Sequence, residues 1–88
     1  MPSYLVETYL ARSQAGQRAA QEQRARSVAG DPTIESVRFE RSIYVPEDEI
    51  CFFVFDAPSG REAALAAQRA GLEPIRVVEA VPSESEGK

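Results

Sequence analysis

The sequence contains no histidine and no tryptophan, and its only cysteine is Cys51. Without histidine, the chain lacks the usual general base of serine- and cysteine-dependent catalysis and the commonest side-chain ligand of transition metals. A single cysteine cannot form an intrachain disulfide, so we expect a reducing compartment. The five glycines are isolated, and no glycine-rich phosphate-binding loop is present. Together these absences exclude the commonest catalytic constellations.

Long apolar runs are also missing. No stretch approaches the roughly 20 apolar residues of a membrane helix, and the opening MPSYLVETYL lacks the basic start and apolar segment of a signal peptide. Ten basic residues against fourteen acidic ones give a net charge of −4, which argues against a nucleic-acid surface. We therefore expect a cytoplasmic protein whose partners include neither membranes nor nucleic acids.

The chain of 88 residues has room for one domain, which we place at residues 1–81. Its most informative stretch is residues 45–55, VPEDEICFFVF, where a turn signal runs directly into six apolar residues. A run that is apolar at both odd and even positions predicts a strand buried on both faces. Residues 82–88, PSESEGK, have no apolar anchor, and we expect them to form a disordered acidic tail.

Three further segments are predicted to be strands, at residues 3–10, 37–45 and 75–81. Within the middle segment, apolar and polar residues alternate, which predicts one drier face. That face holds Val37, Phe39, Ile43 and Val45 together with Arg41. Residues 46–49 then close a hairpin, and we expect the acidic residues at its tip to form a solvated turn.

Two helices are expected between these strands. The first begins with Ser13 as its N-cap and ends at Gly30; a thin stripe of alanines faces the sheet, while glutamines and arginines form a solvated face. The second begins with a capping box, Ser59 followed three residues later by Glu62, and ends in a Schellman-type turn at Gly71.

The predicted order β-α-β-β-α-β is that of an α+β, ferredoxin-like fold, a four-stranded antiparallel sheet with two helices on one face. Its first and third strands are central, in agreement with the apolar character of residues 50–55. The helix-free face then carries one of two sets, either Cys51, Phe53 and Phe55 or Ile50, Phe52 and Val54. Because large exposed apolar patches are rare on monomers, a second copy should cover this face, which predicts a homodimer forming a dimeric α/β barrel.

Two parts of the chain, residues 2–7 and 37–81, resemble a family of small bacterial ferredoxin-like proteins that includes a nickel-binding protein. The resemblance is carried by VPEDE, the apolar strand with one cysteine, the DAPS helix start and the closing RVVEAV. It implies a dimer of ferredoxin-like subunits. The nickel-binding members carry a histidine near what are here residues 40–42, whereas this chain has none. A bound divalent cation is therefore the only cofactor we consider, without a preference for nickel.

The candidate ligand-binding residues are Glu7, Tyr9, Arg41, Cys51 and Phe53. Glu7 is the first choice, because a carboxylate in the middle of a strand must be paired, hydrated or neutralised. It either contacts a ligand in a cleft between subunits or forms a salt bridge to Arg41 or Arg76. Tyr9 either lines that cleft or packs as a cross-strand pair. Cys51 is either a reactive thiol or, in its apolar strand, an inert packing residue.

These observations predict a non-catalytic, homodimeric domain that binds a small ligand or a cation in a cleft lined by Glu7, Arg41 and aromatic residues of the central strands. The alternative is a cofactor-independent enzyme of the dimeric ferredoxin-like type, a small monooxygenase or isomerase. In that case Glu7 would act as the acid-base group.

Overall fold

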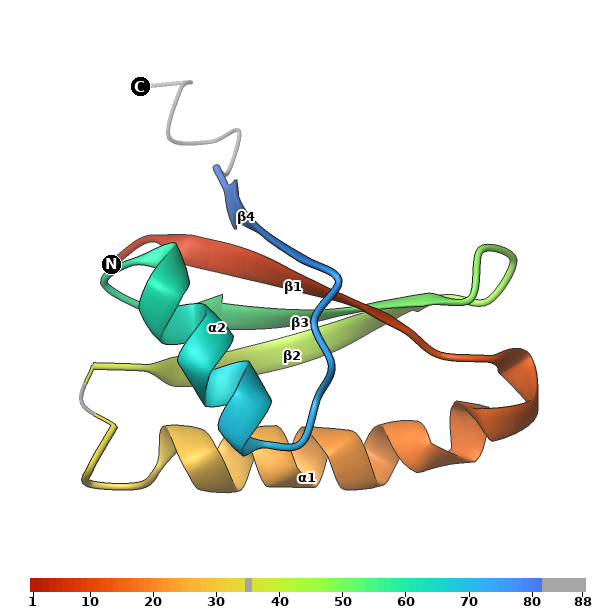
Figure 1. The fold of residues 1–88 in the computed structure, drawn as a ribbon, viewed down its shortest axis with the longest axis horizontal. Coiled ribbons are helices and arrows are strands. Elements are labelled where there is room, and N and C mark those ends of the chain that lie inside the picture. Colours follow the sequence, from red (N-terminus) through yellow and green to blue (C-terminus); the bar gives the residue numbers. More distant parts are fainter. Residues whose placement is uncertain (35, 82–88) are drawn as a thin grey trace.

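The computed structural model describes residues 1–34 and 36–81. Its elements are β1 (Ser3–Tyr9), the 3₁₀ segment η1 (Arg12–Gln17), α1 (Arg18–Ala29), β2 (Arg38–Val45), β3 (Ile50–Asp56), α2 (Gly60–Arg69) and β4 (Arg76–Ala80) (Figure 1). The strands form one antiparallel sheet in the order β2-β3-β1-β4. This confirms the ferredoxin-like fold and the central position of β1 and β3. The tail expected at residues 82–88 lies outside the described residues.

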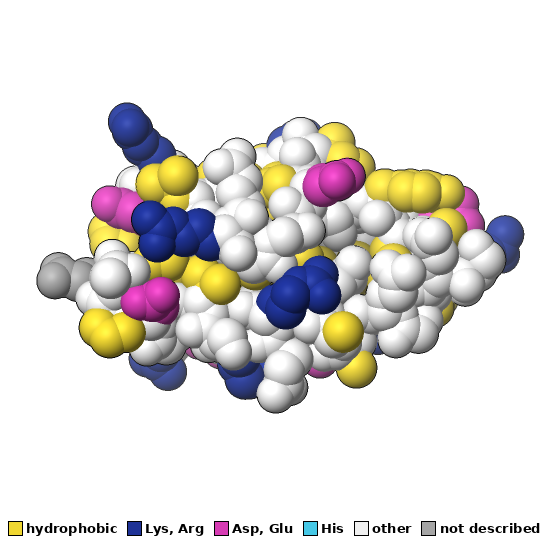
Figure 2. Space-filling model, turned by 60° about the horizontal axis from the view of Figure 1, so that its bottom comes forward, with side chains coloured by type: hydrophobic (Ala, Val, Ile, Leu, Met, Phe, Trp, Pro, Cys, Tyr) yellow, Lys and Arg dark blue, Asp and Glu magenta, His cyan; other side chains and the backbone are white. Residues whose placement is uncertain are grey.

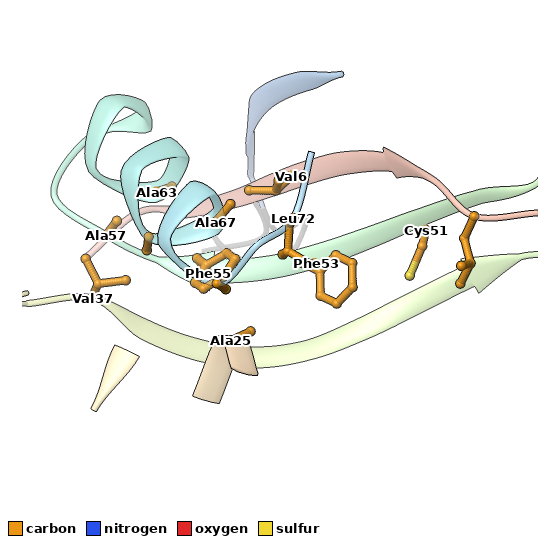
Figure 3. Close-up of a cluster of buried hydrophobic side chains, with 13 residues drawn as sticks. Val6, Ala25, Val37, Cys51, Phe53, Phe55, Ala57, Ala63, Ala67 and Leu72 are labelled. Atoms are coloured by element: carbon orange, nitrogen blue, oxygen red, sulfur yellow. The ribbon is translucent and has the colours of Figure 1, made fainter. Parts of the chain in front are cut away.

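Both helices pack on the same face of the sheet. From the central strands, Val6, Phe53 and Phe55 point toward the helices and are completely buried. They meet small side chains, Ala25 of α1 and a row of alanines on α2 that includes Ala67 (Figure 3). Small side chains let helix backbones approach the sheet closely, and the Phe53 and Phe55 rings of β3 are the largest fully buried side chains of the core.

The start and end of α2 agree with the sequence prediction. The Ser59 hydroxyl accepts a hydrogen bond from the backbone N–H of Glu62 at 3.3 Å and thereby caps the helix. At the other end Gly71 has a φ of +80°, and the Leu72 N–H donates to the Ala67 carbonyl at 3.0 Å. This is the 6→1 bond of a Schellman motif, which favours glycine at the left-handed position.

The start of the first helix differs from the prediction. Ser13 lies inside η1 and does not cap it; the N-cap position is Ala11, which has no side-chain capping bond, and α1 begins only at Arg18. The first turn contains no acidic residue, and Gly16 lowers its helix propensity. Because this helix start has neither a capping side chain nor an acidic residue, it forms a 3₁₀ segment in place of an α-helical turn.

A β-bulge in β2 changes which residues share a face. Phe39 pairs with Phe55, but the next pair is Arg41 with Val54, so Glu40 is an extra residue on β2. The alternation is therefore broken at Glu40, and Phe39 faces the helices whereas Arg41, Ile43 and Val45 face the opposite side. The prediction that one face holds all five residues was wrong, because an inserted residue inverts the parity of a strand.

Candidate functional site

The helix-free side of the sheet, called here the open sheet face, is largely apolar. Cross-strand pairing places fifteen side chains on it: Ser3, Leu5, Glu7, Tyr9, Arg38, Arg41, Ile43, Val45, Ile50, Phe52, Val54, Asp56, Arg76, Val78 and Ala80. Ile43 is 41% exposed, whereas Val54, at the centre of the sheet, is 8% exposed and is shielded by its neighbours. The sequence left open whether Cys51, Phe53 and Phe55 or Ile50, Phe52 and Val54 lie on the helix-free face. The structure shows that it is Ile50, Phe52 and Val54.

One ion pair interrupts the apolar surface of the open sheet face. Arg76 of β4 lies opposite Glu7 of β1, and its Nε is 3.3 Å from the Glu7 Oε1. Arg41 stands on β2, which is separated from β1 by β3, a distance of about 10 Å across two strand spacings. Arg76, and not Arg41, is therefore the partner of Glu7 within the subunit.

The structure divides the five predicted ligand-binding residues between the two faces of the sheet. Glu7, Tyr9 and Arg41 lie on the open sheet face, whereas Cys51 and Phe53 are 0% exposed on the side covered by the helices. Burial raises the pKa of the Cys51 thiol, so the thiolate is disfavoured. The five side chains therefore do not share one face of the subunit.

Tyr9 points to the rim of the sheet, where Glu49 holds several groups together. The Tyr9 hydroxyl donates to Glu49 Oε1 at 3.1 Å, and the backbone N–H of Arg12 donates to Glu49 Oε2 at 2.9 Å. The bond from Arg12, and then that from Tyr9, lower the pKa of the Glu49 carboxyl. Of the hairpin tip, expected to be a solvated turn, Glu47 and Asp48 are exposed, whereas Glu49 is bonded to the start of η1.

A cleft with a volume of about 420 Å³ lies at the end of β1. The cleft exists because β4 is shorter than β1. The pairing of the two strands ends at Glu7 and Arg76, so Thr8 to Leu10 have no partner on β4. The helix side of the hollow carries glutamines, and we call it the amide cleft. Its lining residues are Thr8, Tyr9, Leu10, Gln14, Gln17, Gln21, Arg24, Gly71, Leu72, Glu73 and Ile75.

The polar lining of the amide cleft comes mainly from one side of η1 and α1. Gln17, Gln21 and Arg24 follow one another at intervals of four and three residues, which places them along one face of α1. Gln14, whose backbone within η1 is not helical, lines the same cleft. The sequence alone suggested that these glutamines belong to a solvated surface. The sequence signal that could have identified these glutamines as cleft residues is their regular spacing.

Two hydrogen-bonding features distinguish the amide cleft. The Oε1 of Gln21 is the one buried side-chain nitrogen or oxygen atom without a hydrogen-bond partner in the described part of the chain. The Thr8 hydroxyl, in contrast, donates to the Cys51 carbonyl at 3.0 Å, and Arg24 Nε donates to the Ala70 carbonyl at 2.7 Å. Gln21 Oε1 is therefore a buried atom of the lining whose hydrogen-bonding capacity is not used within the described residues.

The arginines of α1 do more than form a solvated face. Arg18 donates to the buried Ser42 through Nε at 2.8 Å, and the Ser42 hydroxyl donates to Glu22. The guanidinium of Arg26 lies 5.0 Å from the centre of the Phe39 ring. On the side of the molecule that carries α1, basic side chains stand apart among uncharged polar ones and form no continuous basic patch (Figure 2). These arginines anchor the helix to the sheet.

The side chains of the described residues do not form a cluster suited to a metal ion. Within residues 1–34 and 36–81, no group of three or more histidine, cysteine, aspartate or glutamate side chains is arranged to hold one. Over the same residues, no helix has the length and apolar character required to cross a bilayer.

No protein-family model matches this chain, and no curated protein matches it in sequence. Among solved structures, the fold is similar to that of the protein SCO4226 from Streptomyces coelicolor A3(2), with a TM-score of 0.77. The match covers 92% of this chain and 98% of the Streptomyces protein, at 18% sequence identity. At that identity the similarity establishes the fold, a small α+β ferredoxin-like domain, which this chain shares over nearly its whole length.

Proposed function

We propose that this protein is a non-catalytic, homodimeric domain that binds a small polar ligand in the amide cleft. The observation that carries this proposal is the unpartnered Oε1 of Gln21 in the wall of a 420 Å³ cleft. A buried polar atom without a partner costs about 1 to 3 kcal/mol, and such atoms are rare in native proteins. A ligand that induces the Gln21 amide to turn and form hydrogen bonds would recover part of this cost.

The amide cleft differs in position from the site expected from the sequence. That site was placed on the open sheet face beside Glu7 and Arg41, whereas the amide cleft lies toward the helices and shares only Tyr9 with the expected set. Ligand pockets typically have volumes of about 300 to 1,000 Å³, so the cleft is large enough for a small molecule. A second hollow, lined by Ile34, Leu65 and their neighbours, also lies away from the open sheet face.

The open sheet face supports the dimer. Four strands about 4.8 Å apart, each about six residues long at about 3.3 Å per residue, give it an area on the order of 400 Å². A standard interface buries about 800 Å² per partner, so the face alone supplies roughly half of that area. A two-fold, face-to-face pair would cover Leu5, Phe52 and Val78 of both copies. We expect such a dimer to dissociate in the micromolar range.

Binding without catalysis is favoured by the chemistry of the lining. The only carboxylate around the amide cleft is Glu73, and its two lining hydroxyls, those of Thr8 and Tyr9, already donate to the Cys51 carbonyl and to Glu49. Glu7, which the enzyme alternative requires as its acid-base group, is paired with Arg76 outside the cleft. A nucleophile next to a base, the arrangement that activates serine or cysteine, is not found in this lining.

Carboxylates without imidazole or thiolate ligands favour hard, weakly held cations. We therefore expect calorimetry to show that Ni²⁺ binds no more tightly than Mg²⁺. Micromolar, nickel-selective binding would contradict this expectation.

The ligand proposal is tested by recording ¹H–¹⁵N NMR spectra of the labelled protein with a library of polar fragments at millimolar concentration. We expect fragments to shift the side-chain NH₂ signals of Gln17 and Gln21 and the backbone signals of Gly71. The variant Gln21→Leu should remove these shifts, whereas Gln23→Leu, an exposed position of the same helix outside the lining, should retain them. If no fragment shifts the cleft signals, the proposed function is wrong.

A further inference from the structure

We propose that the amide cleft selects small organic carboxylates and that Arg24 is the residue that binds the carboxylate group. This inference rests on the proposed ligand-binding function and specifies its ligand class. It starts from the charges of the lining, in which Arg24 is the only cationic side chain and Glu73 the only anionic one. The remaining polar lining residues are uncharged.

Arg24 is held in place by the end of α2. Its Nε donates to the Ala70 carbonyl at 2.7 Å, and its Nε and Nη2 lie 3.5 and 3.8 Å from the position that a Cβ would occupy on Gly71. Because Gly71 closes the Schellman turn with a positive φ, the guanidinium packs against a backbone surface that carries no side chain. One N–H of the guanidinium is thus used to fix its plane, and the terminal nitrogens remain for a ligand.

Among the described residues, the terminal nitrogens of Arg24 have no anionic partner. Within residues 1–34 and 36–81, no salt bridge involves Arg24, although Glu73 lines the same cleft. Guanidinium groups bind carboxylates through two parallel hydrogen bonds, which are roughly twice as strong as bonds between neutral groups. An arginine with a fixed plane and free terminal nitrogens is suited to this geometry.

The glutamines extend the recognition surface away from Arg24. Gln21, Gln17 and Gln14 lie one after another along the helix, and each side-chain amide offers two N–H donors as well as an acceptor. Apolar side chains of Leu10, Leu72 and Ile75 complete the lining. At about 30 Å³ per water-sized group, the volume of 420 Å³ holds about 14 such groups. The cleft therefore fits a carboxylate with a short, partly apolar body.

The net charge of the chain does not favour the binding of carboxylates, so the proposed preference for them must arise within the cleft. With −4 overall, the protein as a whole repels anions, so electrostatic steering does not bring carboxylates to the cleft. Any preference for a carboxylate over a neutral ligand of the same shape must come from Arg24 and the amide donors beside it. Removing the charge of Arg24 should abolish the preference.

The test compares three probes of nearly equal shape, benzoate, benzamide and benzylamine, by NMR titration of the labelled full-length protein. We expect benzoate to bind at least tenfold more tightly than the other two and to shift the Nε–H signal of Arg24. In Arg24→Gln the benzoate preference should fall to within twofold, and in Arg24→Lys, which keeps the charge but loses the fork, part of it should remain. Arg61→Gln removes the same charge from an exposed site on α2 and should change nothing.

The outcomes separate the two proposals. If none of the probes, nor any fragment, binds at the cleft, the ligand-binding function itself is wrong. If benzamide or benzylamine binds as tightly as benzoate at the same residues, the cleft binds ligands but does not select carboxylates. If benzoate binds preferentially and Arg24→Gln, shown to be folded by its dispersed spectrum, keeps that preference, Arg24 is not the anchor. Should Arg24→Gln not fold, the wild type decides, because an Arg24 Nε–H signal that stays in place at benzoate saturation also shows that Arg24 is not the anchor.

Discussion

The two faces of the sheet carry the same kind of residue but differ in what covers them. On β3, Phe53 points toward the helices and is fully buried, whereas its neighbour Phe52 points to the open sheet face and is partly exposed. The helices cover one face with alanines, and no second layer of the described chain covers the other. The proposed dimer rests on this difference, because a strand that is apolar on both faces is typical of a sheet covered on both sides.

The largest expected effect comes from replacing these two neighbouring phenylalanines with aspartate. In Phe53→Asp, a charge enters a core without a partner, and we expect the chain not to fold, since truncation of a buried Phe alone costs about 3 to 5 kcal/mol. In Phe52→Asp, the charge faces the open sheet face, and we expect a folded monomer. Circular dichroism measures folding, and sedimentation velocity measures mass.

This pair of variants can break the comparison in two ways. A folded Phe53→Asp protein would mean that the core does not depend on the β3 rings that the helices cover. A Phe52→Asp protein that stays dimeric at the same concentration as the unmodified chain would mean that the open sheet face is not the interface.

The covered face also allows a comparison between its two helices. Ser59 caps α2, whereas Ser13 lies within η1 and makes no capping bond. Ser59→Ala should lower the free energy of unfolding by about 1 kcal/mol, and Ser13→Ala should leave it unchanged within a few tenths of a kcal/mol. Urea unfolding of the two variants measures the difference. Equal losses would show that the start of the first helix is capped after all.

The smallest effect is expected at the rim between the two faces, where Glu49 accepts bonds from Arg12 and Tyr9. Because these bonds lower the pKa of Glu49 below its ordinary value of 4.5, their stabilising effect is present above that value. The effect is lost as the pH falls through the lower pKa of the folded state. Urea unfolding of wild type and Glu49→Gln between about pH 3 and pH 6 should show a stability difference that shrinks toward the acid end. A difference that is independent of pH would show that the carboxylate charge is not involved.

The order of elements, the central strands and the end of α2 could all be predicted from the sequence. Each depends on a local pattern, such as the apolar run at 50–55 or the Ser59 and Gly71 signals, and the structure agrees with these patterns. The bulge at Glu40 could not be predicted from the sequence. In sequence, apolar and polar residues alternate along β2, and only the pairing of β2 with β3 reveals the extra residue. The prediction that Ser13 caps the first helix was wrong, because the sequence did not show that the helical segment begins before Ser13.

The candidate site was harder to predict than the fold. The pairing of Glu7 with Arg76 was one of two alternatives, and the choice between Phe52 and Phe53 required the sheet itself. The amide cleft results from β4 being shorter than β1 and from the packing of η1 and α1 beside the residues that β4 leaves unpaired, neither of which is a property of one segment. Only the regular spacing of Gln14, Gln17 and Gln21 was visible in advance.

The most direct test of the dimer is sedimentation equilibrium of the unmodified protein over a series of concentrations from about 1 to 300 μM, around the dissociation range expected for a small interface. We predict a reversible shift from the mass of one chain to twice that mass, with the transition in the micromolar range. The open sheet face would then be covered by its own copy. A mass of one chain at every concentration would contradict the dimer and require another cover for Leu5, Phe52 and Val78.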